Sequence, residues 1–212
     1  MNYSHFSSRK VLEIEKIIVH ERYIYLTLEH DIALLKLKEK VDLSIYTPAC
    51  LAPKDANYTG KTASVYGWGR EKFLHRSCFK FKPPPQVSPV LKQTTLTIES
   101  NDKCQQRNGT VPVCDKEGNE KLHNMSMANH IKDDMLCGYN LGTDACNGDS
   151  GGPLMCGPGH DILVGVAKTV NGDCSNGKKW NLYPDIYTRV APHLTWIYSR
   201  VPRDTKRPHN VV

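Results

Sequence analysis

The chain has 212 residues, of which 39% are apolar and 24% are charged, with 28 Lys and Arg against 22 Asp and Glu. This composition excludes a disordered polyelectrolyte, because it supplies enough apolar side chains for one or two ordinary cores. No apolar run approaches the roughly 18 residues that a membrane helix needs. The formal charge of +6 is scattered, without the one-faced basic stripe of nucleic-acid binders. We therefore predict a globular protein with no nucleic-acid or membrane partner.

The start of the chain and its cysteines give different indications about export. The first residues, MNYSHFSSRKVLEIEK, contain no apolar segment between a basic start and a small-residue cleavage site, so they do not form a signal peptide. Yet eight cysteines are many for a reducing compartment. Four N-glycosylation sequons are present, at Asn2, Asn57, Asn108 and Asn124. We predict a secreted, disulfide-bonded glycoprotein and a chain that lacks its start.

Short apolar segments between turn-forming residues predict strands, in chain order, at 11–20, 32–37, 63–67, 93–98, 162–167 and 186–190. Several short strands with this spacing are typical of an all-β barrel or sandwich. A helix is predicted over 192–201, because Leu194, Ile197 and Tyr198 fall on one face and Pro192 suits a first turn. The triple proline at 83–85 predicts an extended loop over 69–89, and the polar stretch 105–132 is expected to be exposed.

The most informative segment is Asp144-Ala-Cys-Asn-Gly-Asp-Ser-Gly-Gly-Pro-Leu, residues 144–154. Its serine, Ser150, lies between glycines, which let the backbone turn sharply and approach a substrate carbonyl. The N–H groups of Gly148 and Ser150 are then placed to stabilise a developing oxyanion. A plain turn explains Gly-Asp-Ser-Gly alone, but six consecutive residues, Gly-Asp-Ser-Gly-Gly-Pro, favour a nucleophilic serine.

With this segment the sequence resembles the chymotrypsin/trypsin family of serine endopeptidases. His30-Asp-Ile-Ala-Leu-Leu-Lys-Leu is similar to the family segment that bears the triad aspartate, and further matches are Gly67-Trp-Gly, Asp134-Met-Leu-Cys-Gly-Tyr, Ile186-Tyr-Thr-Arg-Val and Trp196-Ile. The resemblance implies an all-β fold of two six-stranded antiparallel β-barrels with a C-terminal α-helix. It also implies hydrolysis of protein substrates through an acyl-enzyme, without a cofactor.

The resemblance divides the chain into a remainder of the first barrel (1–66), the second barrel (67–190), the helix (191–202) and a tail (203–212). The first barrel is expected to be incomplete, because the family's N-terminal portion has no counterpart here. Such a barrel keeps unpaired strand edges and an uncovered core.

The resemblance also assigns catalytic roles. Ser150 would attack the scissile carbonyl, Asp31 would orient the catalytic histidine, and the amides of Gly148 and Ser150 would form the oxyanion hole. In the family the histidine lies in a Thr-Ala-Ala-His-Cys string before the aspartate. His5, His20 and His30 do not match it and are interpreted as surface or strand-end histidines.

Besides the catalytic histidine, the N-terminal sequence that activates family members is missing. Family members carry a new N-terminus of the type Ile-Val-Gly-Gly, whose amino group pairs with the acid before the nucleophile, here Asp149. The chain does not begin in this way. We therefore expect the chain to be inactive as given. A protease homologue that binds or regulates a partner without catalysis is the alternative.

By resemblance, Asp144 would lie at the base of the primary pocket and favour a P1 Arg or Lys. Val170 would narrow the entrance, and Asp185 would place a second acid near Asp144, so one of these two carboxyls is expected to have a raised pKa. Lys168 stands where the family has a serine that hydrogen-bonds the triad aspartate. Its ammonium is expected to pair with Asp31, which favours the non-catalytic alternative.

The cysteines follow the same resemblance in part. It implies disulfides between Cys104 and Cys137 and between Cys146 and Cys174, and it makes Cys50 a tether for a propeptide or upstream module. The family partner of Cys156 stands just before the Gly-Trp-Gly strand, where this sequence has Ala63, so we predict a bond to Cys78, which follows that strand. Cys114 has no assignment. No C-x-x-C occurs, so we predict no metal site.

Overall fold

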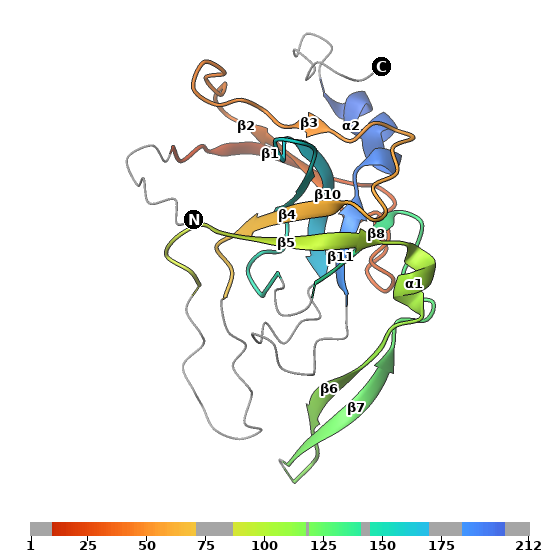
Figure 1. Cartoon of the computed structure of the whole chain (residues 1–212). Helices are drawn as coiled ribbons and strands as arrows, with labels where there is room; N and C mark the ends of the chain where they lie inside the picture. Colours follow the sequence, from red (N-terminus) through yellow and green to blue (C-terminus); the bar gives the residue numbers. More distant parts are fainter. Residues whose placement is uncertain (1–9, 71–86, 118, 141–144, 170–183, 202–212) are drawn as a thin grey trace.

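A closed antiparallel β-barrel is the largest unit of the computed structural model, which describes residues 10–70, 87–117, 119–140, 145–169 and 184–201 (Figure 1). Its strands follow one another in the order β11-β8-β5-β4-β9-β10, and β10 pairs back with β11 to close the ring. They are β4 (Thr62–Gly67), β5 (Lys92–Glu99), β8 (Met135–Tyr139), β9 (Pro153–Cys156), β10 (Ile162–Thr169) and β11 (Asp185–Arg189). A short strand, β3 (Cys50–Leu51), joins β10 in parallel at its outer side.

Alternation of side chains along the strands explains the barrel core. In β5, Leu96 and Ile98 are buried while Thr95 and Thr97 face outward, as the two-residue period of a strand requires. The inward residues meet in one buried cluster, whose members include Ala63, Val65, Leu96, Ile98, Leu154, Val164 and Tyr187. Burying each large apolar side chain contributes about 1.5–3 kcal/mol, so this cluster is the main source of stability.

A separate two-stranded sheet precedes the barrel in the chain. It consists of β1 (Ile14–Val19) and β2 (Ala33–Leu37), paired antiparallel with Ile17 opposite Leu35. One face of this pair, with Leu34, packs toward Leu194 and Ile197 of the C-terminal helix. On the other face Ile17 is 60% exposed and Leu35 is 55% exposed. The described residues add no further strand to this sheet.

The C-terminal segment begins with a 3-10 turn, η2 (Ala191–His193), and continues as α2 (Leu194–Arg200), which lies against the β1–β2 pair (Figure 1). Leu194 and Ile197 form its buried face. None of the helices in the described part of the chain has the length and apolar composition to cross a bilayer.

A β-hairpin extends away from the barrel (Figure 1). It is formed by β6 (Asn108–Cys114) and β7 (Glu120–Ser126) and follows the short helix α1 (Asn101–Gln105), which Ser100 caps by accepting the N–H of Lys103. A disulfide between Cys104 and Cys137 fastens α1 to β8, with 6.4 Å between the two Cα atoms.

Comparison with the sequence-based expectations confirms the barrel and the C-terminal helix. All six predicted strands are present, with ends that differ by up to three residues. The expected boundary at residue 67 is wrong, because β3 and β4 precede it and already belong to the barrel sheet. The strand pattern does not reveal which strands pair. The sequence did not predict the hairpin, α1, β3, β8 or β9. Most of the expected loop 69–89 lies outside the described residues.

Candidate active site

Ser150 lies in an exposed turn between the barrel strand β9 and the segment that begins at Ala145. The N–H of Gly151 donates to the carbonyl of Ala167 (2.7 Å), and the N–H of Ala167 donates to Gly152 (2.8 Å), so β10 anchors the turn. Gly148 and Gly151 have φ angles of 103° and 82°, which residues with a Cβ rarely adopt. The glycines of the motif therefore allow the tight backbone turn that leaves Ser150 exposed.

Two backbone donors beside Ser150 are open to a ligand. The N–H groups of Gly148 and Ser150 donate to no acceptor among the described residues, and both residues are exposed. Free N–H groups next to a serine hydroxyl can bind the oxygen of a carbonyl under attack. Ser150 Oγ likewise has no hydrogen-bond partner in the described part of the chain.

The carboxylate of Asp149 points in the opposite direction, toward the end of β4. Its Oδ1 accepts the N–H of Gly69 (2.6 Å) and its Oδ2 accepts the N–H of Cys146 (2.8 Å). A Cβ on Gly67 would overlap Asp149 Oδ1, and a Cβ on Gly69 would lie 2.5 Å from Asp149 Cγ. The Gly-Trp-Gly segment therefore makes room for this acid, and two backbone amides satisfy it. The expected absence of an amino-terminal partner for Asp149 concerns residues 1–9, which lie outside the described residues.

Asp31 lies two positions before β2 and is fixed to the barrel through its backbone, because its carbonyl accepts the hydroxyl of Thr188 on β11 at 2.8 Å. Burial raises the pKa of its carboxyl, the positive charge of Lys168 counteracts part of this rise, and the charge of Asp134 adds to it. Asp31 therefore occupies a partly desolvated place next to a cation.

Lys168 does not form the expected ion pair with Asp31. Its Nζ is buried and has no hydrogen-bond partner among the described residues. Burial lowers the pKa of the ammonium, and the charges of Asp134, Asp31 and Glu29 oppose this effect. The two groups therefore interact through charge without contact. Because Lys168 directly follows Ala167, which anchors the Ser150 turn, it links the surroundings of Asp31 with those of Ser150.

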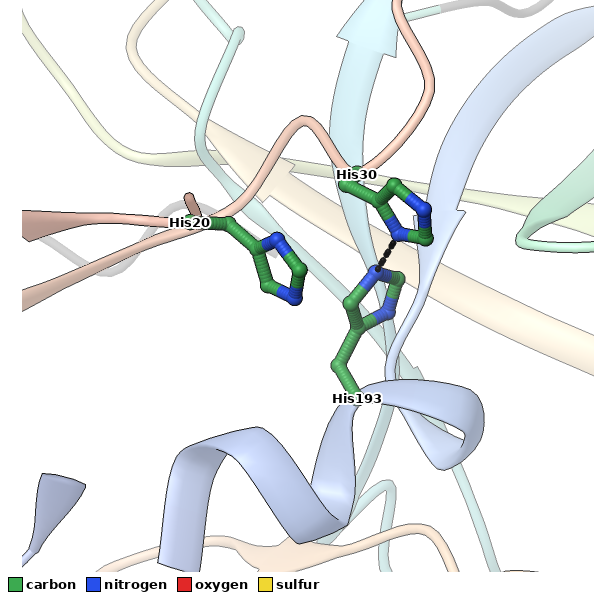
Figure 2. Close-up of side chains that lie close together, drawn as sticks. All are labelled: His20, His30 and His193. Carbon is green, nitrogen blue, oxygen red and sulfur yellow. Dashed lines mark hydrogen bonds between the residues drawn. The ribbon is translucent and has the colours of Figure 1, made fainter. Parts of the chain in front are cut away.

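No described histidine hydrogen-bonds to Ser150 or Asp31. His20 and His30 instead meet His193 in a cluster at the start of the C-terminal helix, shown in Figure 2. His20 directly follows β1, in agreement with its interpretation as a strand-end histidine, but it is not a surface residue, since only 5% of it is exposed. Its ring lies against Trp196. His193 was not singled out in the sequence, because nothing local marks it.

Asp185 begins β11 and is only 3% exposed. Its Oδ2 accepts the N–H of Ala145 (3.1 Å) and the hydroxyl of Tyr187 (3.4 Å). These bonds bring Asp185 beside the backbone that follows Asp144, although its carboxylate is built into the barrel wall. Asp144 and Val170 themselves lie outside the described residues.

Comparison with known proteins identifies the family. The family model described as Trypsin matches residues 2–197. The chain belongs to the trypsin family. It is 32% identical to a tryptase of Mus musculus over 197 residues, which is 92% of this chain and 64% of that protein. It is 31% identical to the serine proteinase stubble of Drosophila melanogaster over 193 residues, 89% of this chain and 21% of that protein. It thus spans less than two thirds of either relative.

A solved structure supports the fold. The structure of neuropsin, described as a serine protease expressed in the limbic system of mouse brain, matches with a TM-score of 0.63 and 24% identity, covering 89% of this chain and 70% of that chain. At this identity the match shows the chymotrypsin-type fold alone.

The cysteines of this trypsin-family chain follow the family only in part. Cys104 is bonded to Cys137, and Cys146 is also disulfide-bonded, while Cys174 lies outside the described residues. The expected bond between Cys156 and Cys78 is wrong, because Cys156 is a free, buried thiol whose Sγ lies 3.7 Å from the carbonyl oxygen of Thr62. Burial raises the pKa of this thiol.

A pocket of about 420 Å³ lies beside Lys168 and was not foreseen from the sequence. Leu26 and Leu28 contribute to one part of its wall, and Met127, His130 and Ile186 to another. The lining is mainly apolar, with Lys168 as a cation on its wall.

Of the four sequons, Asn57, Asn108 and Asn124 are exposed. Asn2 lies outside the described residues.

Proposed function

We propose that this trypsin-family chain carries the nucleophile of a serine endopeptidase whose active form cleaves protein substrates. The observation that carries this proposal is the exposed Ser150 turn, where the N–H groups of Gly148 and Ser150 have no acceptor among the described residues. The reaction is acyl transfer: Ser150 Oγ bonds to the substrate carbonyl carbon, the amine leaves with a proton, and water then hydrolyses the acyl-enzyme. Gly148 and Ser150 N–H stabilise the oxyanion, and Asp31 supplies the charge that orients an imidazole.

The proton of Ser150 needs a base, and no described histidine is within hydrogen-bond distance of it. A serine hydroxyl without a base is a weak nucleophile at neutral pH. The 212-residue chain by itself is therefore inactive in this proposal. Sequencing the transcript upstream of Met1 would show whether a Thr-Ala-Ala-His-Cys segment is encoded.

The proposed P1 preference is for Arg or Lys, through the carboxylate of Asp144, and it is weaker than that of trypsin because Val170 narrows the entrance. Asp185 adds a second acid near this position, as its bond to the Ala145 amide supports. Profiling an active form on a P1-varied peptide library tests this point, and Val170→Gly is expected to raise the preference for basic residues. A preference for Ala or Val over Arg would contradict it.

Secretion, N-glycosylation and a propeptide or upstream module attached through Cys50 belong to the same proposal. They are supported by the disulfides at Cys104 and Cys146 and by the exposure of three sequon asparagines. Release of the glycans by an endoglycosidase, followed by mass spectrometry, tests the glycosylation sites.

A non-catalytic homologue that binds or regulates a partner is the second candidate. The observation in its favour is Lys168, whose buried ammonium has no partner among the described residues and whose charge acts on Asp31. A cation near the triad acid weakens that acid's hold on an imidazolium.

Labelling with a fluorophosphonate probe separates these possibilities. The 212-residue chain is expected to label no faster than its Ser150→Ala variant. Protein isolated from its natural source is expected to label at Ser150, identified in the peptide that contains residues 144–154. Folded natural protein without label would support the non-catalytic homologue, and fast labelling of the 212-residue chain would contradict the inactivity proposed for it.

A further inference from the structure

Three histidines from distant parts of the sequence converge away from Ser150. His20 follows β1, His30 precedes Asp31, and His193 lies at the junction of η2 and α2, and their rings lie close together in Figure 2. One ligand nitrogen of each ring lies within 4.8 Å of the others. His20 and His193 are 5% and 2% exposed, while the His30 side chain is 24% exposed.

The spacing of two of these nitrogens suits a tetrahedral ion. His30 Nδ1 and His193 Nε2 are 3.2 Å apart. Two nitrogens bound to Zn²⁺ at about 2.0–2.1 Å with tetrahedral angles are about 3.3–3.4 Å apart. The distance between these two nitrogens is therefore already close to the distance expected when both bind one Zn²⁺ ion. His20 completes the set by a shift of its ring, which now stacks on His30 at a centroid distance of 4.8 Å.

Hydrogen bonds outside the cluster orient the rings. His193 Nδ1 lies 2.7 Å from the carbonyl oxygen of Arg189, so Nδ1 carries the proton and Nε2 presents its lone pair to the cluster. A carbonyl acceptor on the remote nitrogen is the usual support of a metal-binding histidine. His20 Nδ1 accepts the N–H of Arg22 at 3.2 Å. If Nε2 of His20 binds the ion, the ring proton must lie on Nδ1. The hydrogen bond from Arg22 would then be lost in exchange for the bond to the ion.

An acid supplies the charge that three neutral imidazoles lack. Asp134 Oδ2 lies 3.9 Å from His30 Nδ1 and 4.0 Å from His193 Nε2. The same oxygen accepts the N–H of His30 at 2.6 Å. This bond holds His30 at a φ of 54°, a left-handed conformation that is uncommon for a non-glycine residue. The backbone is therefore held in an uncommon form at the residue that presents its ring to the cluster.

Solvent reaches the cluster from the His30 side. A pocket of about 280 Å³ is lined there by His30, by the acids Glu29, Asp133 and Asp134, and by Lys132. Three carboxylates outnumber the single ammonium around this pocket and favour the approach of a cation.

We propose that His20, His30 and His193 form a site for a divalent transition-metal ion of the Zn²⁺ type, with Asp134 as its anionic partner. Imidazole nitrogen with one carboxylate is a donor set that suits Zn²⁺ and not Mg²⁺, which requires oxygen ligands in octahedral geometry. The bound ion joins the ends of β1 and β2 to the start of α2. The sequence motifs for zinc did not reveal it, since its ligands are separated by up to 173 positions between His20 and His193.

Calorimetric titration of the purified 212-residue chain with ZnCl2 tests the proposal, with MgCl2 as the control ion. One Zn²⁺ is expected to bind per chain and to raise the thermal unfolding midpoint, because a ligand that binds the native state stabilises it by mass action. Loading with Co²⁺ should give the visible absorption bands of a tetrahedral site with nitrogen and oxygen ligands. Absence of Zn²⁺ binding by the folded chain would overturn the proposal.

Variants locate the ion. His30→Ala is expected to weaken Zn²⁺ binding by at least about 10-fold. Changing a residue that only supports a metal ligand already weakens metal binding by about 10-fold to 100-fold. Asp134→Asn is expected to weaken it by about 10-fold to 100-fold. His130→Ala, an exposed histidine outside the cluster, should leave the affinity unchanged. The partly exposed His30 is chosen because replacing the buried His193 risks the fold. Unchanged affinity in folded His30→Ala would place the ion elsewhere and overturn the proposal.

Discussion

The β-barrel and the β1–β2 strand pair are built from similarly apolar strands, yet they bury them to different extents. In the barrel Leu154 is fully buried and Val65 and Leu96 are each 3% exposed, because six strands close around a shared interior. In the strand pair Ile17 and Leu35 lie opposite each other and are more than half exposed. Closure of a sheet gives every strand two neighbours, whereas a two-stranded sheet covers only the face that another element reaches.

The strand pair is held by its attachment to α2. Its inner face contributes Leu34 to the cluster around Leu194. At its end, Glu21 accepts the indole N–H of Trp196 (2.8 Å) and pairs with Arg200. The barrel therefore has a core of its own, and the strand pair depends on docking. The four predictions below test this contrast, in order of decreasing effect.

The largest effect is expected from matched leucine truncations. Leu154→Ala in the barrel should lower the free energy of unfolding by about 3–5 kcal/mol, since it leaves a cavity among fully buried side chains. Leu35→Ala in the strand pair should change it by less than about 0.5 kcal/mol, because the side chain is already half in water. Urea unfolding followed by tryptophan fluorescence measures both. Equal losses would show that the exposed face of the pair is covered in solution.

Removal of the disulfide should come next. Cys104 and Cys137 are 33 positions apart, and opening a loop of this length destabilises a protein by about 3–4 kcal/mol through the entropy of the unfolded chain. The double variant Cys104→Ala/Cys137→Ala tests this better than a reductant, which would also open the disulfide at Cys146. A loss confined to the hairpin, with the barrel transition unchanged, would contradict the view that α1 and β8 unfold with the barrel.

A pair of carboxylate variants compares a buried ion pair with an exposed one. Glu99 accepts two hydrogen bonds of 2.7 Å from Arg107 and pairs with Lys103, and its side chain is 7% exposed. Burial alone would raise the pKa of Glu99, but the hydrogen bonds and charges of Arg107 and Lys103 outweigh it and lower the pKa. Glu99→Gln should therefore cost about 2 kcal/mol at neutral pH.

The pH dependence has a defined sign. Because the folded-state pKa of Glu99 is lowered, its stabilisation is complete above the usual glutamate pKa of about 4.3 and is lost as pH falls through the folded value. The difference between the parent chain and Glu99→Gln should therefore shrink on acidification. Glu21→Gln, at the exposed ion pair of the strand pair, should show no measurable change in unfolding. A Glu99 difference that grows toward low pH would refute the assignment.

The smallest effect on stability is expected from Ile17→Thr/Leu35→Thr. The two hydroxyls replace apolar surface that is already exposed, so the free energy of unfolding should change by less than about 0.5 kcal/mol. Binding of a hydrophobic dye and self-association in size-exclusion chromatography should both decrease, because exposed apolar patches drive both. Retention of strong dye binding would assign it to another surface.

The sequence by itself determined the features that are written in consecutive residues. The Gly-Asp-Ser-Gly-Gly-Pro run predicts the exposed turn of Ser150, since glycine alone takes its backbone angles freely. Alternating apolar residues predict six strands, and the spacing of Leu194 and Ile197 predicts the helix. The β6–β7 hairpin escaped prediction because it falls in the stretch 105–132, which is rich in polar residues and was expected to be exposed. Helix α1 is too short to show a period.

Only the tertiary structure decided the features that join distant residues. Closure of the barrel between β10 and β11, the free thiol of Cys156 and the inclusion of β3 and β4 in the barrel sheet depend on which strands pair. The meeting of His20 and His30 with His193 depends on where α2 docks. Local periodicity fixes the direction of a side chain relative to its own strand or helix, whereas contacts across more than a hundred positions follow from the packing of whole elements.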